Sequence, residues 1–367
     1  MFSKKIIRFQ GLFLFLGLLT IMVGESFAAE YWVRVDAAGM TMADGRTVPV
    51  WGFGLDQDSN FTTTEGSVSV PGPTLRVGPD DNVLIIHLLN NLSEPVSLNI
   101  LGQRLTNNTG PVWTNFPDDT QTWSGARPAG NYTARVRSFS HETLPGQVGE
   151  YRWESFRPGT YLLQSGTNPA KQVEMGLYLP VVKDVGQGSA YADVPYDAEV
   201  VVVFHEIDPI LHQAIAAGTY GAVPGATIGS SVLREPKYFL MNGMSYPSGG
   251  LLPINGKMML LQGDRLLIRF LNAGLNTHVP QLMGSYMTLW AEDGNRYRYP
   301  KQAYGFELNA GKTVDAILVS PINPPWQFPL YDARLNLNNA GAYPGGMFAY
   351  IKSSLPEHRQ ADHEKNP

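Results

Sequence analysis

The sequence predicts an all-β protein made of two similar Greek-key β-sandwiches. Short apolar segments recur along the chain with turn residues between them, which is the pattern of a strand-rich fold. The 367 residues include 38 glycines and 27 prolines, so turns are frequent. The apolar spacing of an amphipathic helix is rare, and only residues 209–217 predict a short helix.

The strongest strand predictions are short apolar runs bounded by Gly, Pro, Asn, Asp or Ser. These segments are 83–89, 96–101, 132–136, 176–182, 200–204, 266–271, 287–291 and 314–319. A chain of this length, with strands in both halves, suits two domains of ordinary size.

An internal repeat relates the two halves of the chain. The equivalent pairs are Asn90 and Asn272, Gly102 and Gly284, Tyr161 and Tyr331, and Gly176 and Gly346. The first two pairs share one spacing in the sequence and the last two share another. Matching spacings on both sides of a turn-rich middle indicate duplication, so each copy is predicted to be one sandwich.

The amino terminus has the pattern of an export signal. Lys4, Lys5 and Arg8 precede an apolar run over residues 11–23, and small residues at 26 and 28 predict cleavage after Ala28. The alternative is an uncleaved anchor, but the run is shorter than the roughly 20 residues that span a bilayer. No later run is long enough, so no membrane span is expected in the mature chain. The predicted organisation is a signal peptide at 1–28, sandwiches at 29–184 and 200–352, a linker at 185–199 and a charged tail at 353–367.

Composition excludes several classes of function. The net charge is −5, which disfavours nucleic-acid binding as the main role. The chain has no cysteine, so disulfides, thiolate nucleophiles, iron–sulfur clusters and cysteine-ligated copper are all excluded. We find no G-x-S-x-G, P-loop or dinucleotide fingerprint in its required context.

Several motifs resemble the multicopper oxidases, whose domains are cupredoxin-like. In the first half these are PGPTLRV at 71–77, the strand at 82–90, SLNILG at 97–102, RPGTYLLQSG at 157–166 and GLY at 176–178. In the second half they are RFLNAG at 269–274, HVPQLMG at 278–284 and GM at 346–347. The resemblance covers roughly residues 31–351. It implies two tandem cupredoxin-like Greek-key domains and the two-domain branch of the family, whose members are commonly trimers.

The copper ligands of the family are missing from the matching positions. The family holds a trinuclear copper cluster with four H-x-H pairs, and in a strand such pairs point to one side. The matching pairs here are Asn99 and Leu101, Gln164 and Gly166, Gln281 and Met283, and Arg334 and Asn336, or Asn336 and Asn338 in an alternative register. Leu and Gly cannot coordinate a metal, and amides are poor copper ligands. Only His278 and Met347 match ligands of the family's blue copper site.

We expect the amides and Arg334 to hydrogen-bond one another where copper would lie, with Leu101 and Met283 packed beside them. The alternative is that solvent fills these positions. A separate and weak candidate metal cluster comprises His205, Glu206, Asp208 and His212. Six methionines of the second half are predicted to fill its core, or alternatively to hold Cu(I): Met241, Met244, Met258, Met259, Met283 and Met287.

The resemblance and its departures predict an exported, non-catalytic scaffold or binding component, without copper, in a periplasmic or cell-surface metal-oxidation or electron-transfer system. A homotrimer is expected, and the protein partner is unknown. Two alternatives stay open: a copper-binding or storage protein that uses His and Met residues, and a residual copper-dependent oxidoreductase.

Overall fold

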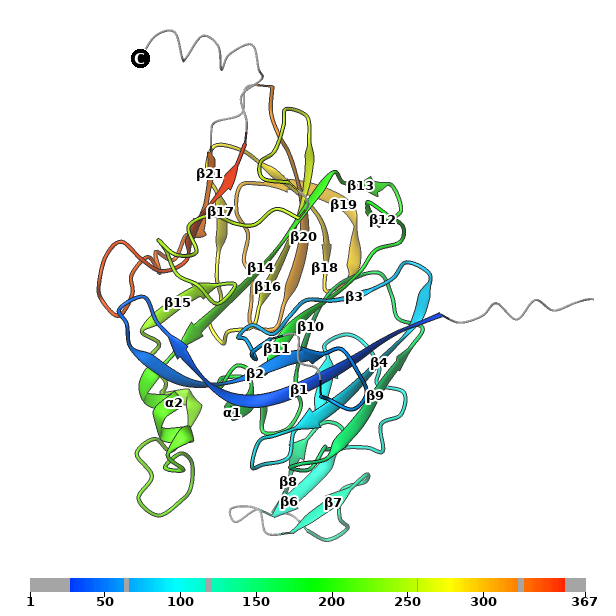
Figure 1. The fold of residues 1–367 in the computed structure, drawn as a ribbon, viewed down its shortest axis with the longest axis vertical. Helices are drawn as coiled ribbons and strands as arrows, with labels where there is room; N and C mark the ends of the chain where they lie inside the picture. The colour runs from blue at the N-terminus through cyan, green and yellow to red at the C-terminus, as the bar shows by residue number, and fades with distance from the viewer. Residues whose placement is uncertain are drawn as a thin grey trace, which may run out of the picture.

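The computed structural model describes residues 27–62, 66–115, 121–131, 133–255, 257–322 and 327–353. Within them, two groups of packed sheets lie toward opposite ends of the molecule (Figure 1), and the all-β prediction is confirmed. Most of the predicted signal peptide and tail lies outside the described residues. Phe27 and Ala28 begin the first strand, where Ala28 pairs with Val83. No helix of the described chain is long and apolar enough to cross a membrane.

The first sandwich contains two four-stranded sheets of order β2-β1-β4-β9 and β3-β11-β10-β5. The bounds are β1 Phe27–Thr41, β2 Thr47–Asp56, β3 Leu75–Val77, β4 Asp81–Asn90, β5 Leu98–Ile100, β9 Val148–Glu154, β10 Gly159–Ser165 and β11 Tyr178–Lys183. In β4, Leu84, Ile86 and Leu88 are buried, while Ile85, His87 and Leu89 on the other face are partly exposed. This period of two is what a sheet with one face on the core requires.

The second sandwich contains a six-stranded sheet of order β15-β14-β16-β20-β18-β19 and a three-stranded sheet of order β17-β21-β22. The bounds are β14 Ala198–Ile207, β15 Tyr238–Met241, β16 Arg265–Asn272, β17 Pro280–Leu282, β18 Met287–Glu292, β19 Asn295–Ala303, β20 Thr313–Val319, β21 Gln327–Asp332 and β22 Phe348–Lys352. Phe204, Phe270 and Leu330 are among the buried side chains between the two sheets.

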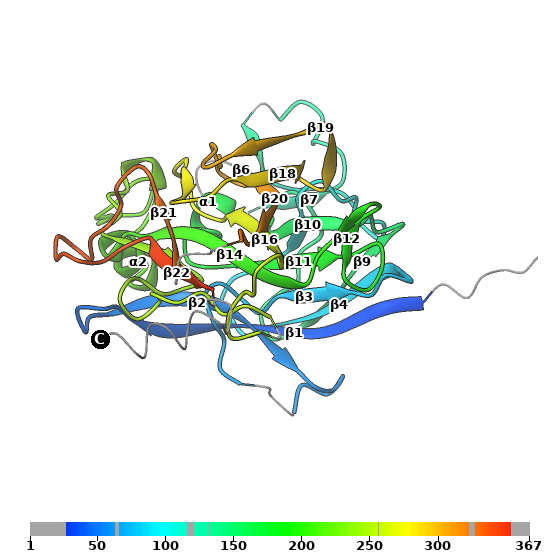
Figure 2. The same cartoon turned by 90° about the horizontal axis from the view of Figure 1, so that it is seen from above.

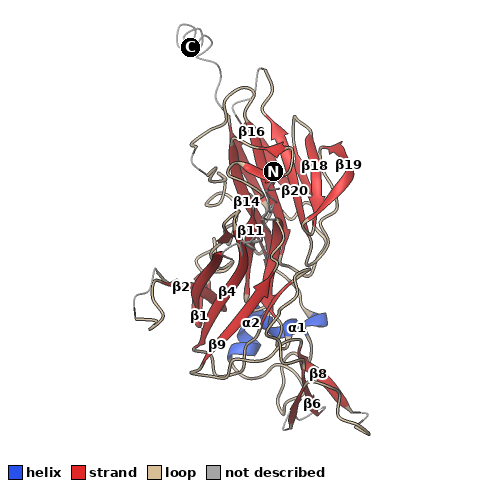
Figure 3. Ribbon diagram, turned by 90° about the vertical axis from the view of Figure 1, so that its right-hand side faces the viewer, coloured by secondary structure: helices blue, strands red, loops and turns tan. Residues whose placement is uncertain are grey.

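The other elements lie outside these four sheets (Figures 1 and 3). They are an arm of β6 Val112–Asn115, β7 Thr122–Ser124 and β8 Ala134–Ser138, a hairpin of β12 Ser189–Tyr191 and β13 Val194–Pro195, the helices α1 Pro169–Gln172 and α2 Pro209–Ala216, and a 3-10 turn at Ser231–Leu233. The helix predicted at 209–217 is thus α2. It begins where the Asp208 carboxylate accepts hydrogen bonds from the backbone N–H groups of Ile210 and Leu211, with Pro209 at its first position.

The two halves repeat one another in strand order and in hydrogen bonding. In each, a strand pairs antiparallel with one neighbour and parallel with the other: β1 with β2 and β4, and β14 with β15 and β16. Asn90 donates to the carbonyl groups of Glu94 and Thr143, and Asn272 donates to those of Asn276 and Leu308 in the same way. The sequence match between Asn90 and Asn272 is therefore a structural equivalence.

Side chains from both sandwiches interlock at the interface between them. The Thr313 hydroxyl of β20 donates to the Thr160 carbonyl of β10 at 2.7 Å. Gly294, just before β19, has φ +70° and lies against the Tyr161 ring, so that a Cβ atom there would overlap the ring. Only glycine meets both requirements at low cost. The interface therefore fixes how the two sandwiches are oriented.

Candidate functional site

Three of the four substituted positions in the first sandwich meet on neighbouring strands. Asn99 of β5 lies directly opposite Gln164 of β10. Gly166 follows β10, and its N–H donates to the Ser97 carbonyl at 3.2 Å. A Cβ atom on Gly166 would overlap the Asn99 amide. The Asn99 side chain thus fills the space that a larger residue at 166 would need.

Leu101, the fourth of these positions, packs against the second sandwich. Its N–H donates to the Leu162 carbonyl at 3.1 Å, and its side chain joins an apolar cluster that includes Leu271 and Ala273. A Cβ atom on Gly311 would lie 3.2 Å from Leu101 Cδ1. Leu101 is therefore part of the interface between the sandwiches.

The substituted positions of the second sandwich do not meet those of the first in a shared polar network. Gln281 of β17 is half-buried and Met283 is 49% exposed. Arg334 donates to the Thr277 carbonyl at 2.7 Å, and Asn336 donates to Asp332 at 2.6 Å. The expectation that Arg334 and the amides would bond one another across the interface is therefore wrong for these two residues, because their partners lie within their own sandwich.

The structure also corrects the register of the fourth pair. Gln164 pairs with Asn99 on one side and with Tyr178 on the other. In the second sandwich the residue between the equivalent partners, Gln281 and Phe348, is Tyr331. Arg334 and Asn336 lie after the end of β21. The repeat spacing does not extend to this strand because the loop after β21 is longer than the loop after β10.

His278 lies at the centre of a buried charged cluster. Its Nδ1 is 2.9 Å from an Asp332 oxygen and its Nε2 is 2.6 Å from a Glu206 oxygen, and all three side chains are fully buried. Burial alone would lower the pKa of His278, but the hydrogen bonds to Asp332 and Glu206 outweigh it and raise the pKa above 6.5. An imidazolium that donates from both nitrogens has no lone pair for a metal.

Arg234 and Glu174 extend this cluster toward the first sandwich. Arg234 Nη1 is 3.1 Å from a Glu206 oxygen and 3.9 Å from a Glu174 oxygen. Burial raises the pKa of Glu174 to about 7, although the Arg234 guanidinium favours its ionised form. Glu174 comes from the loop before β11 and Arg234 from the loop before β15, so the two charges face each other across the sandwiches.

The side chains of the weak candidate metal cluster, His205, Glu206, Asp208 and His212, each bond to a different partner. His205 Nδ1 shares a hydrogen bond of 2.7 Å with the Tyr178 hydroxyl, and burial lowers the pKa of His205 to about 3. Asp208 caps α2, and His212 Nδ1 donates to the Pro49 carbonyl at 2.7 Å. Within the described ranges no group of three or more His, Asp or Glu side chains is placed to hold a metal ion.

The sulfur-bearing side chains divide into core and surface. Met347, the second match to the blue copper site, is fully buried among apolar side chains, as are Met241 and Met287. The prediction that all six methionines fill the core is wrong for four of them. Met244 is 46% exposed, Met258 86%, Met259 36% and Met283 49%.

Comparison of the folds identifies the architecture. No family model matches the sequence, and no curated protein matches it. Among solved structures, a blue copper oxidase from Nitrosomonas europaea superposes with a TM-score of 0.65 at 16% identity, over 89% of this chain and 86% of that one. The chain has a multicopper-oxidase-like fold.

Two further structures agree with this fold. The multicopper oxidase mgLAC gives a TM-score of 0.62 at 20% identity, over 90% of this chain and 88% of that one. The copper nitrite reductase from Nitrosomonas europaea gives 0.57 at 17% identity, over 89% and 94%. The resemblance read from the motifs is therefore confirmed for the multicopper-oxidase-like fold along most of the chain.

The sequence did not reveal which residues surround His278 in this multicopper-oxidase-like fold. Asp332 lies at the end of β21 and Glu206 near the end of β14, far from each other in the sequence. One signal was present in the sequence: Glu206 and Asp332 each lie near the end of a strand, and both belong to the second half of the chain, which also contains His278. Pairing them required the packing of two different sheets, because Glu206 comes from β14 and Asp332 from β21 and both contact one imidazole.

Proposed function

We propose that the protein is an exported, non-catalytic scaffold or binding component with a multicopper-oxidase-like fold, working in an extracytoplasmic metal-oxidation or electron-transfer system. The observation that carries this is the state of His278. Glu206 and Asp332 occupy both of its nitrogens, so the only histidine at a copper-ligand position serves as a buried cation.

The donor set at the other positions supports the same proposal. Copper in such folds requires imidazole and thiolate ligands, and the chain has no cysteine. The positions of the trinuclear cluster hold amides, apolar side chains, a glycine and an arginine. If the fourth ligand pair is placed at Tyr331 and its neighbours instead of at Arg334 and Asn336, it still contains no histidine. The residues present do not fit the family's copper centres.

The copper content of purified protein tests the proposal. After loading with Cu(II) and dialysis, we expect less than one copper per chain, no blue absorption band and no oxidation of phenols or ferrous iron by dioxygen. Asn99→His with Leu101→His should not restore activity, because three ligand pairs and the thiolate would still be missing. Retention of about three coppers per chain, or turnover of a laccase substrate, would overturn the proposal. Tight binding of several Cu(I) ions to the exposed methionines would favour the storage alternative.

We also propose a homotrimer, closed by contact between the second sandwich of one copy and the first sandwich of the next. A heterologous contact that closes into a ring buries the same pair of surfaces at each subunit boundary. The exposed side chains of Met283, Tyr286 and Tyr304 support this, since they leave apolar groups uncovered in one chain and the two tyrosine rings contact each other. Light scattering should give three times the chain mass. Met283→Glu should dissociate the trimer, while Met258→Glu, at the more exposed control position, should not. A monomer at high protein concentration would contradict the proposal.

A further inference from the structure

The outermost strand of the second sandwich concentrates positive charge on an acidic protein. β19, with the sequence NRYRYPKQA, carries Arg296, Arg298 and Lys301 and no acidic residue, whereas the whole chain has a net charge of −5. All three cations are exposed, and Tyr299 between them is 78% exposed. β19 lies at the margin of its sheet (Figures 2 and 3).

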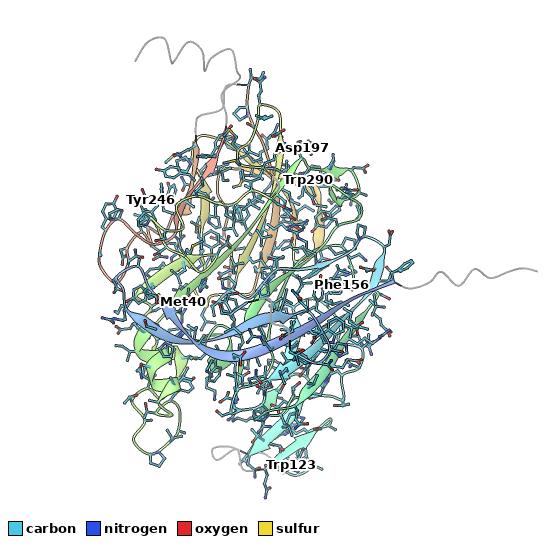
Figure 4. All side chains as sticks on the ribbon, viewed as in Figure 1. Met40, Trp123, Phe156, Asp197, Tyr246 and Trp290 are labelled. Atoms are coloured by element: carbon cyan, nitrogen blue, oxygen red, sulfur yellow. The ribbon has the colours of Figure 1, made fainter. Side chains whose placement is uncertain are left out.

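These cations are not used for ion pairing in the part of the chain that the structure describes. Arginines elsewhere in the protein pair with carboxylates, as the buried Arg269 does with Glu199 and Arg234 does with Glu206. Arg296 and Arg298 instead lie over aromatic rings. The guanidinium of Arg296 is 5.9 Å from the ring centre of Trp290, a residue of β18 labelled in Figure 4, and that of Arg298 is 5.4 Å from that of Tyr299.

A nearby ring favours a guanidinium that can bind a carboxylate. The electrostatic attraction between the ring and the cation limits the motion of the side chain, and its N–H groups can still donate hydrogen bonds. A carboxylate accepts two such hydrogen bonds in parallel. Arg296 and Arg298 therefore offer two carboxylate sites on one strand, with Lys301 as a third charge further along.

The strand geometry favours an extended polypeptide as the ligand. Alternate residues of an extended chain lie about 7 Å apart, so an extended segment with acidic side chains at every second position presents several carboxylates along one side. Such a segment can follow β19 past the irregular stretch between Arg296 and Lys301. The register of β18 and β19 shifts between Leu289 and Ala291, which bulges β19 away from its neighbour. Pairing with β19 of a second copy is opposed by three features: the like charges, the bulge and Pro300. The complementary partner is therefore an acidic strand.

We propose that β19 is a docking site for an extended acidic segment of a partner protein. Charge complementarity sets the chemistry of that partner: an extended segment with several carboxylates along one side, bound by Arg296, Arg298 and Lys301. The surface lies on a different strand from Gln281 and Met283, so the proposal does not depend on the trimer or on the state of copper binding.

Binding of a labelled peptide tests this site. We use a decapeptide of alternating Glu and Thr, with a Gln and Thr peptide as the uncharged probe, and measure fluorescence anisotropy at low salt. The triple variant R296Q/R298Q/K301Q should bind the acidic peptide about tenfold more weakly than the unaltered protein. The control triple R46Q/R104Q/K237Q removes three exposed cations elsewhere and should bind within about twofold. Thermal unfolding of both triples confirms that each is folded.

Three results would overturn the proposal. Equal loss in the two triples would show that only net charge matters. Equal binding of the Glu and Gln peptides would show that carboxylates are not recognised. Stronger, β19-dependent binding of polygalacturonate than of the peptide would assign the strand to an anionic polysaccharide instead.

Discussion

Arg269→Met should lower the free energy of unfolding by about 3–5 kcal/mol, the cost of removing one partner from a buried ion network. Arg269 is fully buried in β16. Its guanidinium donates to Glu199, to Asp184 and, at 3.0 Å, to the Thr160 hydroxyl. Without the cation, Glu199 would stay in a buried position and, among the described residues, would keep Arg76 alone as a charged partner, and that arginine is half-exposed.

The effect should be large because the network crosses the interface between the sandwiches. Thr160 belongs to β10 of the first sandwich and donates to Asp315 of β20 at 2.5 Å. Burial raises the pKa of Asp315, although the Arg269 guanidinium opposes this shift. Burial would also raise the pKa of Glu199, but Arg269 and Arg76 together lower it. Removing Arg269 therefore leaves both buried carboxylates without the cation that favours their ionised forms.

Urea unfolding followed by tryptophan fluorescence measures the change. Arg152→Met is the matched control, because Arg152 pairs with Glu154 at the surface, with side chains 36% and 53% exposed, and such pairs contribute less than about 1 kcal/mol. If Arg269→Met does not fold, Arg269→Lys keeps the charge without the planar fork and should show an intermediate loss. A loss within about 1 kcal/mol for Arg269→Met would contradict the assigned role.

The sequence was sufficient to predict the fold because its signals are local and are repeated. β4 and the strand that ends at Asn272 are both short, mostly apolar runs that end at a polar residue, and such runs predict strands whatever their place in the chain. Asn90 and Asn272 could be matched because each closes a loop with the same short-range hydrogen bonds. The motifs around them added the family resemblance.

The candidate site was less predictable because it depends on register and on distant partners. The match of Tyr161 to Tyr331 placed Arg334 at the fourth ligand pair, whereas the strand pairing puts Tyr331 itself at the position of Gln164. A change in the length of one loop is enough to break a sequence spacing without changing the sheet. Similarly, nothing in the residues around His278 indicates that Glu206 reaches it from another strand.

His278→Gln should lower the free energy of unfolding by about 3–5 kcal/mol near pH 6, because it leaves two buried carboxylates without the cation between them. The carboxylates of Glu206 and Asp332 would each be raised in pKa by burial, but His278 outweighs this and both pKa values are lowered. Their contribution to stability is present above their ordinary pKa values of 4.5 and 3.8 and is lost as the pH falls below them.

The contribution of His278 to stability changes with pH in the opposite direction. This pH dependence distinguishes a charged His278 from one that only fills space. Because the pKa of His278 is raised above 6.5, its contribution is complete below pH 6.5 and is lost as the pH rises through the folded-state value. The difference between the original protein and His278→Gln should therefore be largest between about pH 5 and 6.5 and should shrink at alkaline pH. His87→Gln is the control, since His87 pairs with Glu30 at the surface at 2.7 Å and should cost less than about 1 kcal/mol. Equal losses for His278→Gln at pH 6 and pH 9 would show that His278 is neutral in the folded protein. Its nitrogens would then not be engaged as an imidazolium, and the main argument against a metal at this position would fail.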